Sequence, residues 1–325
     1  MNPIARVLRR IHRERLPPRF WIVWGAVLAL SRRGPRAAAV RLREGLAERR
    51  RWRAVRLSEP GPPLRFDKAA PSPRLSIVIP VYDRWRYTYH CLRSIVACDD
   101  RVSYEVVVDN ASRDGTAEHL ASFEGLVLLR QEANRGYVEG CNLGVAAASG
   151  ELILLLNNDT EVTSGCLDRL VSVLDEEKGV EVVGPKFLFP NGRLQEAGNF
   201  VYRDGSARNR GKFDDLWKAE YESRAEVDYV SGAALLVRRS LFDEVGGLDE
   251  RYSPGFWEDV DLCFAVDERG LQIVCEPAAV VYHFEGSSAW RHPEGGGAWR
   301  PESNAYLFRE RWAERLEHLR KRGLE

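Results

Sequence analysis

Three clusters of polar side chains in this sequence each follow a short apolar run, where they could bind a ligand. They are Tyr82-Asp83, Asp109-Asn110 and Asn157-Asn158-Asp159-Thr160. When apolar runs form the strands of an open parallel sheet, ligands bind beyond the carboxyl ends of those strands. One polar strand end is ordinarily a turn or a helix cap. Three that meet at one edge of a sheet predict a polar cleft.

Asp159, the carboxylate of the third cluster, is the candidate metal ligand. Mg²⁺ and Mn²⁺ prefer oxygen ligands and often bind through one or two carboxylates together with phosphate oxygens. Such an ion would neutralise the charge on a departing diphosphate. The alternative for Asp159 is an Asx turn before a helix expected from Ser164. His283 is a second candidate ligand, although a single histidine is more often structural.

Glu258 and Asp259 stand at the start of a helix predicted over 259–268. The helix dipole favours acidic residues at this position, so the position alone is ordinarily structural. The aromatic neighbour Trp257 and the preceding Pro254-Gly255 favour a functional site. A carboxylate placed there could remove a proton from an acceptor hydroxyl.

The elements that must position these residues alternate between apolar β-branched runs and helical patterns. This alternation predicts an α/β fold with a mostly parallel sheet that helices cover on both faces. The segment over 203–224 is polar and is predicted to be a mobile loop. We expect strands over 75–81, 104–108, 126–129, 152–156, 180–188, 227–237, 271–274 and 279–282, and helices over 85–97, 114–121, 137–148, 164–174, 259–268 and 301–325.

The N-terminal part of the chain is strongly basic. Residues 1–59 contain 16 Arg, no Lys and four Glu, although the 325-residue chain has a formal net charge of zero. The apolar run over 21–30 is shorter than the roughly 20 residues that span a bilayer, and no small-residue signal cleavage site follows it. Residues 1–57 are therefore expected either to lie on an anionic membrane surface or to pack on their own domain or on a partner.

Proline-rich stretches around residues 60–63 and 71–73 punctuate the end of this basic region and read as a linker. The predicted division is an Arg-rich helical arm with its linker over 1–72, a main domain over 73–300 and a C-terminal helix over 301–325.

Several other chemistries lack their signatures. The six cysteines have neither metal-ligand spacing nor the pattern of a secreted disulfide framework, which favours a reducing compartment. The sequence contains no phosphate loop, no dinucleotide fingerprint and no nucleophile elbow. Nothing beyond the basic arm resembles a nucleic-acid module, so we expect no nucleic-acid partner.

Taken together and in order, the short motifs of the chain resemble the family 2 glycosyltransferases of the GT-A fold, particularly the rhamnosyltransferase-like branch. The resemblance covers roughly residues 74–290, and the order and spacing of its motifs are more specific than any one of them. The motifs are residues 75–82, 107–116, 134–137, 141–144, 150–160, 184–186, 191–198, 230–233, 246–249, 258–262 and 283–286.

The resemblance implies a role for each matching position. Asp259 would be the catalytic base with Glu258 beside it, and Asp159 and His283 would hold Mg²⁺ or Mn²⁺. Asp109 would contact the nucleoside. The nucleotide-sugar site as a whole would comprise Pro80, Val81, Tyr82, Asp83, Asp109, Asn134, Asn142, Asn158, Ser231 and Gly232.

The chain departs from the family pattern at two places. The metal motif reads Asn157-Asn158-Asp159 and keeps one carboxylate, so metal binding would rest on Asp159, His283 and the donor's diphosphate. The second strand is followed by Asp109-Asn110 rather than by two acids, as is common in the rhamnosyltransferase-like branch.

The implied activity is an inverting transfer from a nucleotide-diphosphate donor, dTDP-rhamnose or a UDP-sugar, to a glycan or lipid-linked acceptor of a bacterial cell envelope. The active site would be cytoplasmic, with the protein peripheral at the inner face of the cell membrane. One alternative is a non-catalytic, membrane-associated scaffold with the same fold. Another is a nucleotidyltransferase, which would carry a Gly- and Arg-rich loop where this chain has residues 80–83.

Overall fold

The computed structural model describes residues 54–66, 74–98, 103–284 and 301–319. The predictions for the basic arm over 1–53, including its membrane contact, lie outside the described residues. Within the described ranges, no helix combines the length and the apolar character that a membrane span requires.

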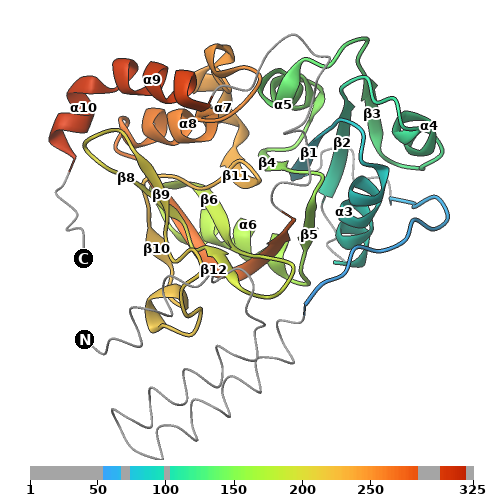
Figure 1. Ribbon diagram of the computed structural model, residues 1–325, viewed down its shortest axis with the longest axis horizontal. Coiled ribbons are helices and arrows are strands. Elements are labelled where there is room, and N and C mark those ends of the chain that lie inside the picture. Colours follow the sequence, from blue (N-terminus) through green and yellow to red (C-terminus); the bar gives the residue numbers. More distant parts are fainter. Residues whose placement is uncertain (1–53, 67–73, 99–102, 285–300, 320–325) are drawn as a thin grey trace, which may run out of the picture.

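A mixed ten-stranded sheet forms the centre of the molecule (Figure 1), in the order β10-β12-β6-β11-β4-β1-β2-β3, with β5 paired to β12 and β7 paired to β6. Neighbouring strands are parallel from β4 through β1 and β2 to β3, and again between β6 and β12. Strand β11 lies between the two parallel groups and runs antiparallel to both neighbours. The predicted α/β sheet is therefore confirmed, as a mixed sheet.

The strands of the large sheet are β1 (Leu75–Val81), β2 (Ser103–Asp109), β3 (Val127–Arg130), β4 (Leu152–Leu156), β5 (Thr160–Val162), β6 (Val180–Leu188), β7 (Leu194–Glu196), β10 (Ala225–Glu226), β11 (Ala234–Arg238) and β12 (Gln272–His283). A separate hairpin pairs β8 (Asn199–Val201) with β9 (Ala207–Asn209).

The helices are α3 (Trp85–Ala97), α4 (Thr116–Ala121), α5 (Gly136–Ala147), α6 (Cys166–Glu176), α7 (Arg239–Val245), α8 (Glu258–Asp267), α9 (Pro301–Arg311) and α10 (Ala313–His318). Short 3-10 turns η2 (Ala219–Tyr221) and η3 (Glu250–Tyr252) complete the described elements.

Both faces of the sheet are buried against other elements. Alternate residues of a strand enter the two cores, because successive side chains point to opposite faces. In β1, Val78 packs in the core that includes α5 and α8, whereas Ile77 and Ile79 pack in the core that includes α3 and α6. Residues of β4 divide between the same two cores. This explains why these central strands are continuously apolar rather than alternating.

Four regions of the predicted secondary structure need correction. The predicted strand over 227–237 is reduced to β11, because the chain turns at Ser231 to Ala233. The two predicted strands over 271–282 are one strand, β12, with an irregular register between Glu276 and Val280. The predicted loop over 203–224 contains β9 and η2. The predicted helix over 301–325 is two helices, α9 and α10, as far as residue 319.

The C-terminal helices pack on α8 (Figure 1). The Asn304 side chain donates hydrogen bonds to the carbonyl oxygens of Tyr252, Gly255 and Phe256, at 2.8, 2.9 and 3.1 Å. Phe308 lies 4.9 Å from both Trp257 and Phe264, centroid to centroid. Helix α9 therefore fixes the loop that leads into the start of α8.

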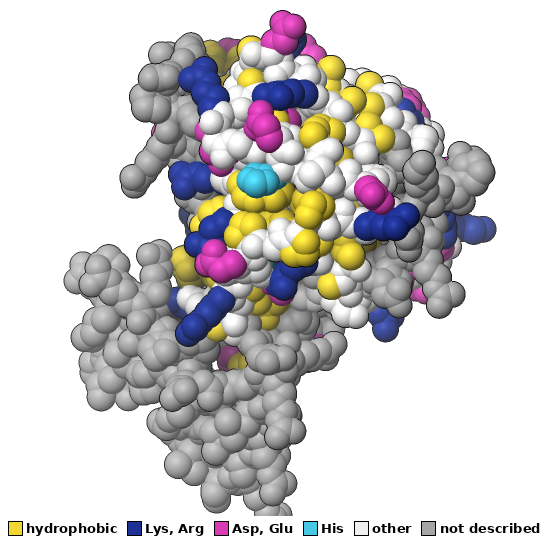
Figure 2. Space-filling model, turned by 90° about the vertical axis from the view of Figure 1, so that its right-hand side faces the viewer, with side chains coloured by type: hydrophobic (Ala, Val, Ile, Leu, Met, Phe, Trp, Pro, Cys, Tyr) yellow, Lys and Arg dark blue, Asp and Glu magenta, His cyan; other side chains and the backbone are white. Residues whose placement is uncertain are grey.

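Beside β3 and α4, the opposite end of the molecule presents hydrophobic side chains among charged ones (Figure 2). Trp85 at the start of α3 stacks on His119 of α4, with ring centroids 4.6 Å apart, and meets Phe123 edge-on at 5.7 Å. These contacts hold α3 against α4 and against the segment that leads into the edge strand β3.

Candidate active site

A cavity of about 280 Å³ opens at the carboxyl ends of β1 and β4 and at the starts of α5 and α8. Most of the predicted site residues line it. Those brought together are Pro80, Val81, Tyr82, Asn134, Asn158, Ser231, Gly232, Glu258, Asp259 and His283. Strand ends that are distant in the sequence thus form one polar cleft, as the sequence predicts.

Asp259 lies at the start of α8, where two backbone N–H groups fix its carboxylate. Its Oδ2 accepts a hydrogen bond from Gly232 at 2.9 Å, and its Oδ1 accepts one from Val260 at 2.8 Å. The two residues before the helix, Phe256 and Trp257, have φ angles of 76° and 75°. Non-glycine residues rarely adopt this conformation, and such residues cluster at functional sites. The helix start is therefore held in one orientation toward the cavity.

The backbone of Gly232 links Tyr137 of α5 to Asp259 of α8. Its carbonyl oxygen accepts a hydrogen bond from the Tyr137 hydroxyl at 2.6 Å, while its N–H donates to Asp259. Burial raises the pKa of Tyr137 well above its ordinary value, so the phenol stays neutral and remains a donor. A Cβ atom added to Gly232 would lie 2.9 Å from the Tyr137 oxygen. Position 232 therefore has room only for glycine while Tyr137 keeps this place.

The adjacent carboxyls of Glu258 and Asp259 do not ionise alike. Burial raises the pKa of both, and the charge of Asp259 raises that of Glu258 further. The backbone N–H groups of Gly232 and Val260 oppose the rise for Asp259. Since two adjacent buried charges repel each other, the pair resists carrying two negative charges at once.

Asp159 and His283 meet at the antiparallel pairing of β5 with β12. The His283 Nε2 atom lies 3.2 Å from Asp159 Oδ1, and Phe284 N–H donates to the Asp159 carbonyl oxygen at 2.9 Å. His283 lines the cavity, whereas Asp159 lies behind it and is 1% exposed. Within the described ranges, no group of three His, Cys, Asp or Glu side chains could hold a metal ion. One carboxylate and one imidazole still fit a divalent cation whose other ligands come from a diphosphate.

Two predicted carboxylates shape the loop beside the cavity without lining it. Asp109 is fully buried at the end of β2, where its Oδ1 accepts a hydrogen bond from Ser112 N–H at 3.1 Å. Asp83 Oδ1 accepts one from Arg113 N–H at 2.7 Å. The neighbouring Asn110 does line the cavity, and its side chain donates to the Gly136 carbonyl oxygen at 3.2 Å. Asp109 therefore does not line the cavity in which it was expected to contact a nucleoside.

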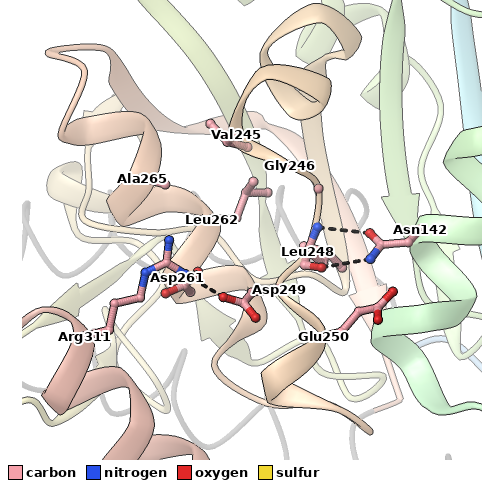
Figure 3. Close-up of a pocket in the computed structure, with 11 residues that line it drawn as sticks. Asn142, Val245, Gly246, Leu248, Asp249, Glu250, Asp261, Leu262, Ala265 and Arg311 are labelled. Carbon is pink, nitrogen blue, oxygen red and sulfur yellow. Dashed lines mark hydrogen bonds and ion pairs between the residues drawn. The ribbon is translucent and has the colours of Figure 1, made fainter.

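Asn142 lies in a different place from the other predicted residues. It faces a second cavity, of about 250 Å³ (Figure 3). Its amide donates to the Leu248 carbonyl oxygen at 2.8 Å and accepts from the Leu248 N–H at 3.0 Å. Both amide atoms therefore hold the Gly246–Leu248 turn against α5, and Asn142 is not brought to the site.

The second cavity is a region of paired charges. Arg311 of α9 bridges Asp249 and Asp261, at 2.8 and 2.6 Å (Figure 3). Asp261 also accepts hydrogen bonds from the Tyr252 hydroxyl and the Trp312 indole, at 2.9 and 2.8 Å. These groups fasten α9 and η3 to α8, which is a structural task.

Further residues line the cavity beside the predicted site residues. Asn110 and Asn157 belong to the polar clusters noted in the sequence, Gly255 to the Pro-Gly pair before α8, and Ala233 follows Gly232. The others are Gly136, Tyr137, Gln195, Glu196, Asn209, Lys212 and Phe256. Glu196 stands out, because it is a buried carboxyl at the end of β7 whose pKa burial raises to about 7. Residues 195 and 196 belong to the motif over 191–198, whereas Asn209 and Lys212 fall in the predicted loop, which hid them.

Comparison with known proteins shows what this chain is similar to. The family model "Glycosyl transferase family 2" matches residues 76–246, which is more than half of the chain. An L-rhamnosyltransferase of Mycobacterium tuberculosis, acting on N-acetylglucosaminyl-diphospho-decaprenol by its name, is 28% identical over 67% of this chain and 78% of that protein. The O-antigen biosynthesis protein RfbC of Myxococcus xanthus is 32% identical over 67% of this chain.

The first curated relatives are much longer than the region matched. The match covers 28% of an uncharacterised protein of Sinorhizobium fredii and 18% of RfbC. Among solved structures, GalNAc-T7 with UDP, GalNAc and Mn²⁺ superposes with a TM-score of 0.62 at 16% identity, covering 76% of this chain and 50% of that one. This likeness shows a GT-A-like fold. The family match, and the order of motifs that it spans, show that the chain belongs to glycosyltransferase family 2.

Proposed function

We propose that the cavity transfers a sugar from a nucleotide-diphosphate donor to an acceptor hydroxyl, with inversion at the anomeric carbon and Asp259 as the general base. The observation that carries this proposal is the state of the Asp259 carboxylate. The carboxylate faces the cavity and accepts hydrogen bonds from two backbone N–H groups. In the described part of the chain, no Lys or Arg side chain forms an ion pair with it. Burial raises its pKa, which makes it a stronger base.

The proposed reaction moves one proton and exchanges one bond. The acceptor oxygen attacks the anomeric carbon as its proton passes to Asp259, and the bond from that carbon to the diphosphate oxygen breaks with its electron pair leaving on the diphosphate. Burial and the charge of Asp259 both raise the pKa of Glu258, which disfavours a second negative charge beside Asp259. The Gly232 N–H and Tyr137 keep Asp259 in place throughout.

The leaving diphosphate would lie toward Asp159 and His283, which would hold Mg²⁺ or Mn²⁺. A bound divalent cation supplies charge neutralisation for the departing diphosphate. The nucleotide would lie along Pro80 to Tyr82, Asn110 and Asn158, at the ends of β1, β2 and β4. Asp83 and Asp109 would act from behind by holding the loop over 110–113.

For the substrates, we propose dTDP-rhamnose or a UDP-sugar as donor and a glycan or lipid-linked acceptor of the cell envelope. The L-rhamnosyltransferase and the O-antigen protein among the relatives support this class. The basic arm would hold the protein at an anionic membrane surface at the inner face of the cell membrane. A non-catalytic scaffold of the same fold is the competing outcome of the test below.

The test is a turnover panel with the full-length chain. UDP-, dTDP- and GDP-sugars are each incubated with Mn²⁺, Mg²⁺ or EDTA and with a lipid-diphosphate glycan acceptor, and release of the nucleoside diphosphate is measured. We expect release from one class of donor, with metal and without EDTA. If no donor is cleaved and none stabilises the folded chain in a thermal shift assay, the catalytic proposal is contradicted and the scaffold is favoured.

A further inference from the structure

Glu196 is a buried carboxyl on a wall of the cavity that the proposed mechanism does not use. It ends β7, is 6% exposed and lines the cavity together with Asp259 and His283. Burying a carboxyl is costly unless hydrogen bonds compensate it. A buried carboxyl in a cleft whose burial shifts its pKa is a candidate functional group, provided that its geometry supports a task.

Two amides from the β8–β9 hairpin clamp this carboxyl. Asn199 donates to Glu196 Oε1 at 3.1 Å, and Asn209 donates to Oε2. Asn209 also donates to the Asn199 side-chain oxygen at 2.9 Å, which links the two clamping residues. Asn199 is fully buried. The carboxyl is therefore held in one orientation by a rigid support, as a recognition group requires.

Glu196 shares the wall of the cavity with Asp259 and His283, the groups assigned to the two ends of the proposed reaction. Asp259 marks the side of the attacking hydroxyl, and His283 marks the side of the departing diphosphate. In a displacement with inversion, these two groups stand on opposite sides of the anomeric carbon, so the space between them belongs to the transferred sugar.

We propose that Glu196 is the residue that recognises the transferred sugar, by accepting hydrogen bonds from hydroxyl groups of its ring. This inference rests on the proposed function and names a specificity-determining residue for it. A carboxylate can accept from several donors at once, so its two oxygens suit a pair of neighbouring hydroxyls even while each accepts an amide N–H. A site built to hydrogen-bond a substrate hydroxyl rejects an analogue that lacks it.

The test separates recognition of the sugar from recognition of the nucleotide. The E196Q variant is compared with wild type and with E226Q, in which an exposed glutamate of β10 is changed. Each protein is titrated calorimetrically, in Mn²⁺, with UDP, dTDP and GDP, and kcat/KM for the corresponding nucleotide sugars is measured by release of the nucleoside diphosphate. We expect E196Q to bind the free diphosphate within twofold of wild type but to lose about 10- to 100-fold in kcat/KM with the nucleotide sugar. E226Q should match wild type in both.

A substrate change completes the test. With a donor that lacks the hydroxyl that Glu196 contacts, the kcat/KM of wild type should fall by a similar factor. The kcat/KM of E196Q should fall little further with the same deoxy donor. If Glu196 only supports the hairpin, E196Q should instead lose diphosphate binding and thermal stability together. Its loss of kcat/KM should then be the same for every deoxy donor. The E196D variant, which keeps the charge but shortens the reach, should discriminate among donors differently from wild type.

Two results would overturn the inference. One is an E196Q protein whose kcat/KM for the donor equals that of wild type. The other is an E196Q protein whose loss of kcat/KM, relative to wild type, is the same for the donor and for the deoxy donors. Failure of the proposed function looks different, because wild type itself would then bind and cleave none of the nucleotide sugars. Since the controls bind free diphosphate, a misfolded E196Q would be recognised by its failure to do so.

Discussion

Helix α8 presents two carboxylates, two residues apart, to two different cavities. Asp259 faces the larger cavity and accepts hydrogen bonds from backbone N–H groups only. Asp261 faces the second cavity, beside Arg311 (Figure 3). Trp312 and Tyr252 also donate hydrogen bonds to it. Burial raises the pKa of both, but for Asp261 the indole and guanidinium partners oppose the rise.

On the proposed function, the difference separates the general base from a structural carboxylate. A buried carboxylate whose partners include a cation and neutral donors has its charge compensated, and removing it leaves those partners unsatisfied. A buried carboxylate with backbone donors alone is positioned by neutral groups, and no cation compensates its charge. The motif over 258–262 therefore contains both functions on one turn of helix. The predictions below test this contrast.

The largest expected effect on folding is that of D261N. The change removes one of the two carboxylates that Arg311 binds and weakens the hydrogen bonds from Tyr252 and Trp312. Buried donors left unsatisfied cost up to about 3 kcal/mol of unfolding free energy. Urea unfolding of the variant and of wild type measures it. Donor binding by the folded variant should stay within threefold of wild type, because Asp261 does not line the larger cavity. A variant as stable as wild type would show that the cluster around Arg311 contributes nothing to the fold.

The next effect concerns the pH dependence of stability at Glu196. Its folded pKa of about 7 exceeds the ordinary glutamate value of 4.5, so between these values the folded state binds more protons than the unfolded state. Stability therefore falls as pH rises through this window, and ionising Glu196 costs on the order of 3 kcal/mol. E196Q cannot ionise. Its unfolding free energy relative to wild type should rise between pH 5 and pH 8.

This comparison is made in EDTA, by urea unfolding at both pH values. The groups that act on Glu196 are Asp259, His283 and the two clamping amides, and all of them are present in both proteins. An unchanged difference between the two proteins at pH 5 and pH 8 would contradict the raised pKa.

A smaller effect is expected for G232A. The added methyl group would lie 2.9 Å from the Tyr137 oxygen and 3.5 Å from the Asp259 Cβ atom. Overpacking of this kind typically costs about 1–3 kcal/mol. We expect a tenfold or greater fall in kcat with a modest loss of thermal stability. A G232A variant with the kcat of wild type would show that the contact between Gly232 and Tyr137 does not position Asp259.

Much of the sheet could be predicted from the sequence. Strand β1 and helix α3 have the predicted bounds to the residue, because a buried central strand is a continuous apolar run, whereas Tyr89, Leu92 and Ile95 recur at helical spacing. The helix start that carries Glu258 and Asp259 was predicted within one residue. These elements have strong periodic signals and determine most of the cavity.

The remaining wall could not be predicted, because its strands are short. Strands β7, β8 and β9 have three residues each, which gives no hydrophobic period to detect. Glu196 and Asn209 belong to them and were missed. Asn142 shows a different limit, since an amide that caps a turn and an amide that binds a ligand have the same residue type. The depth of Asp109 and Asp159 behind the cavity is likewise set by packing that the sequence does not show.

The measurement that tests the central claim most directly is a single-turnover experiment on D259N with the donor that the panel identifies. Donor affinity and the rate of donor cleavage are measured separately, with wild type beside it. We predict an affinity within threefold of wild type and a cleavage rate lower by about 10²- to 10⁴-fold, because the base has been removed. Cleavage by D259N at the wild-type rate would contradict the assignment of Asp259, and with it the contrast between the two carboxylates of α8.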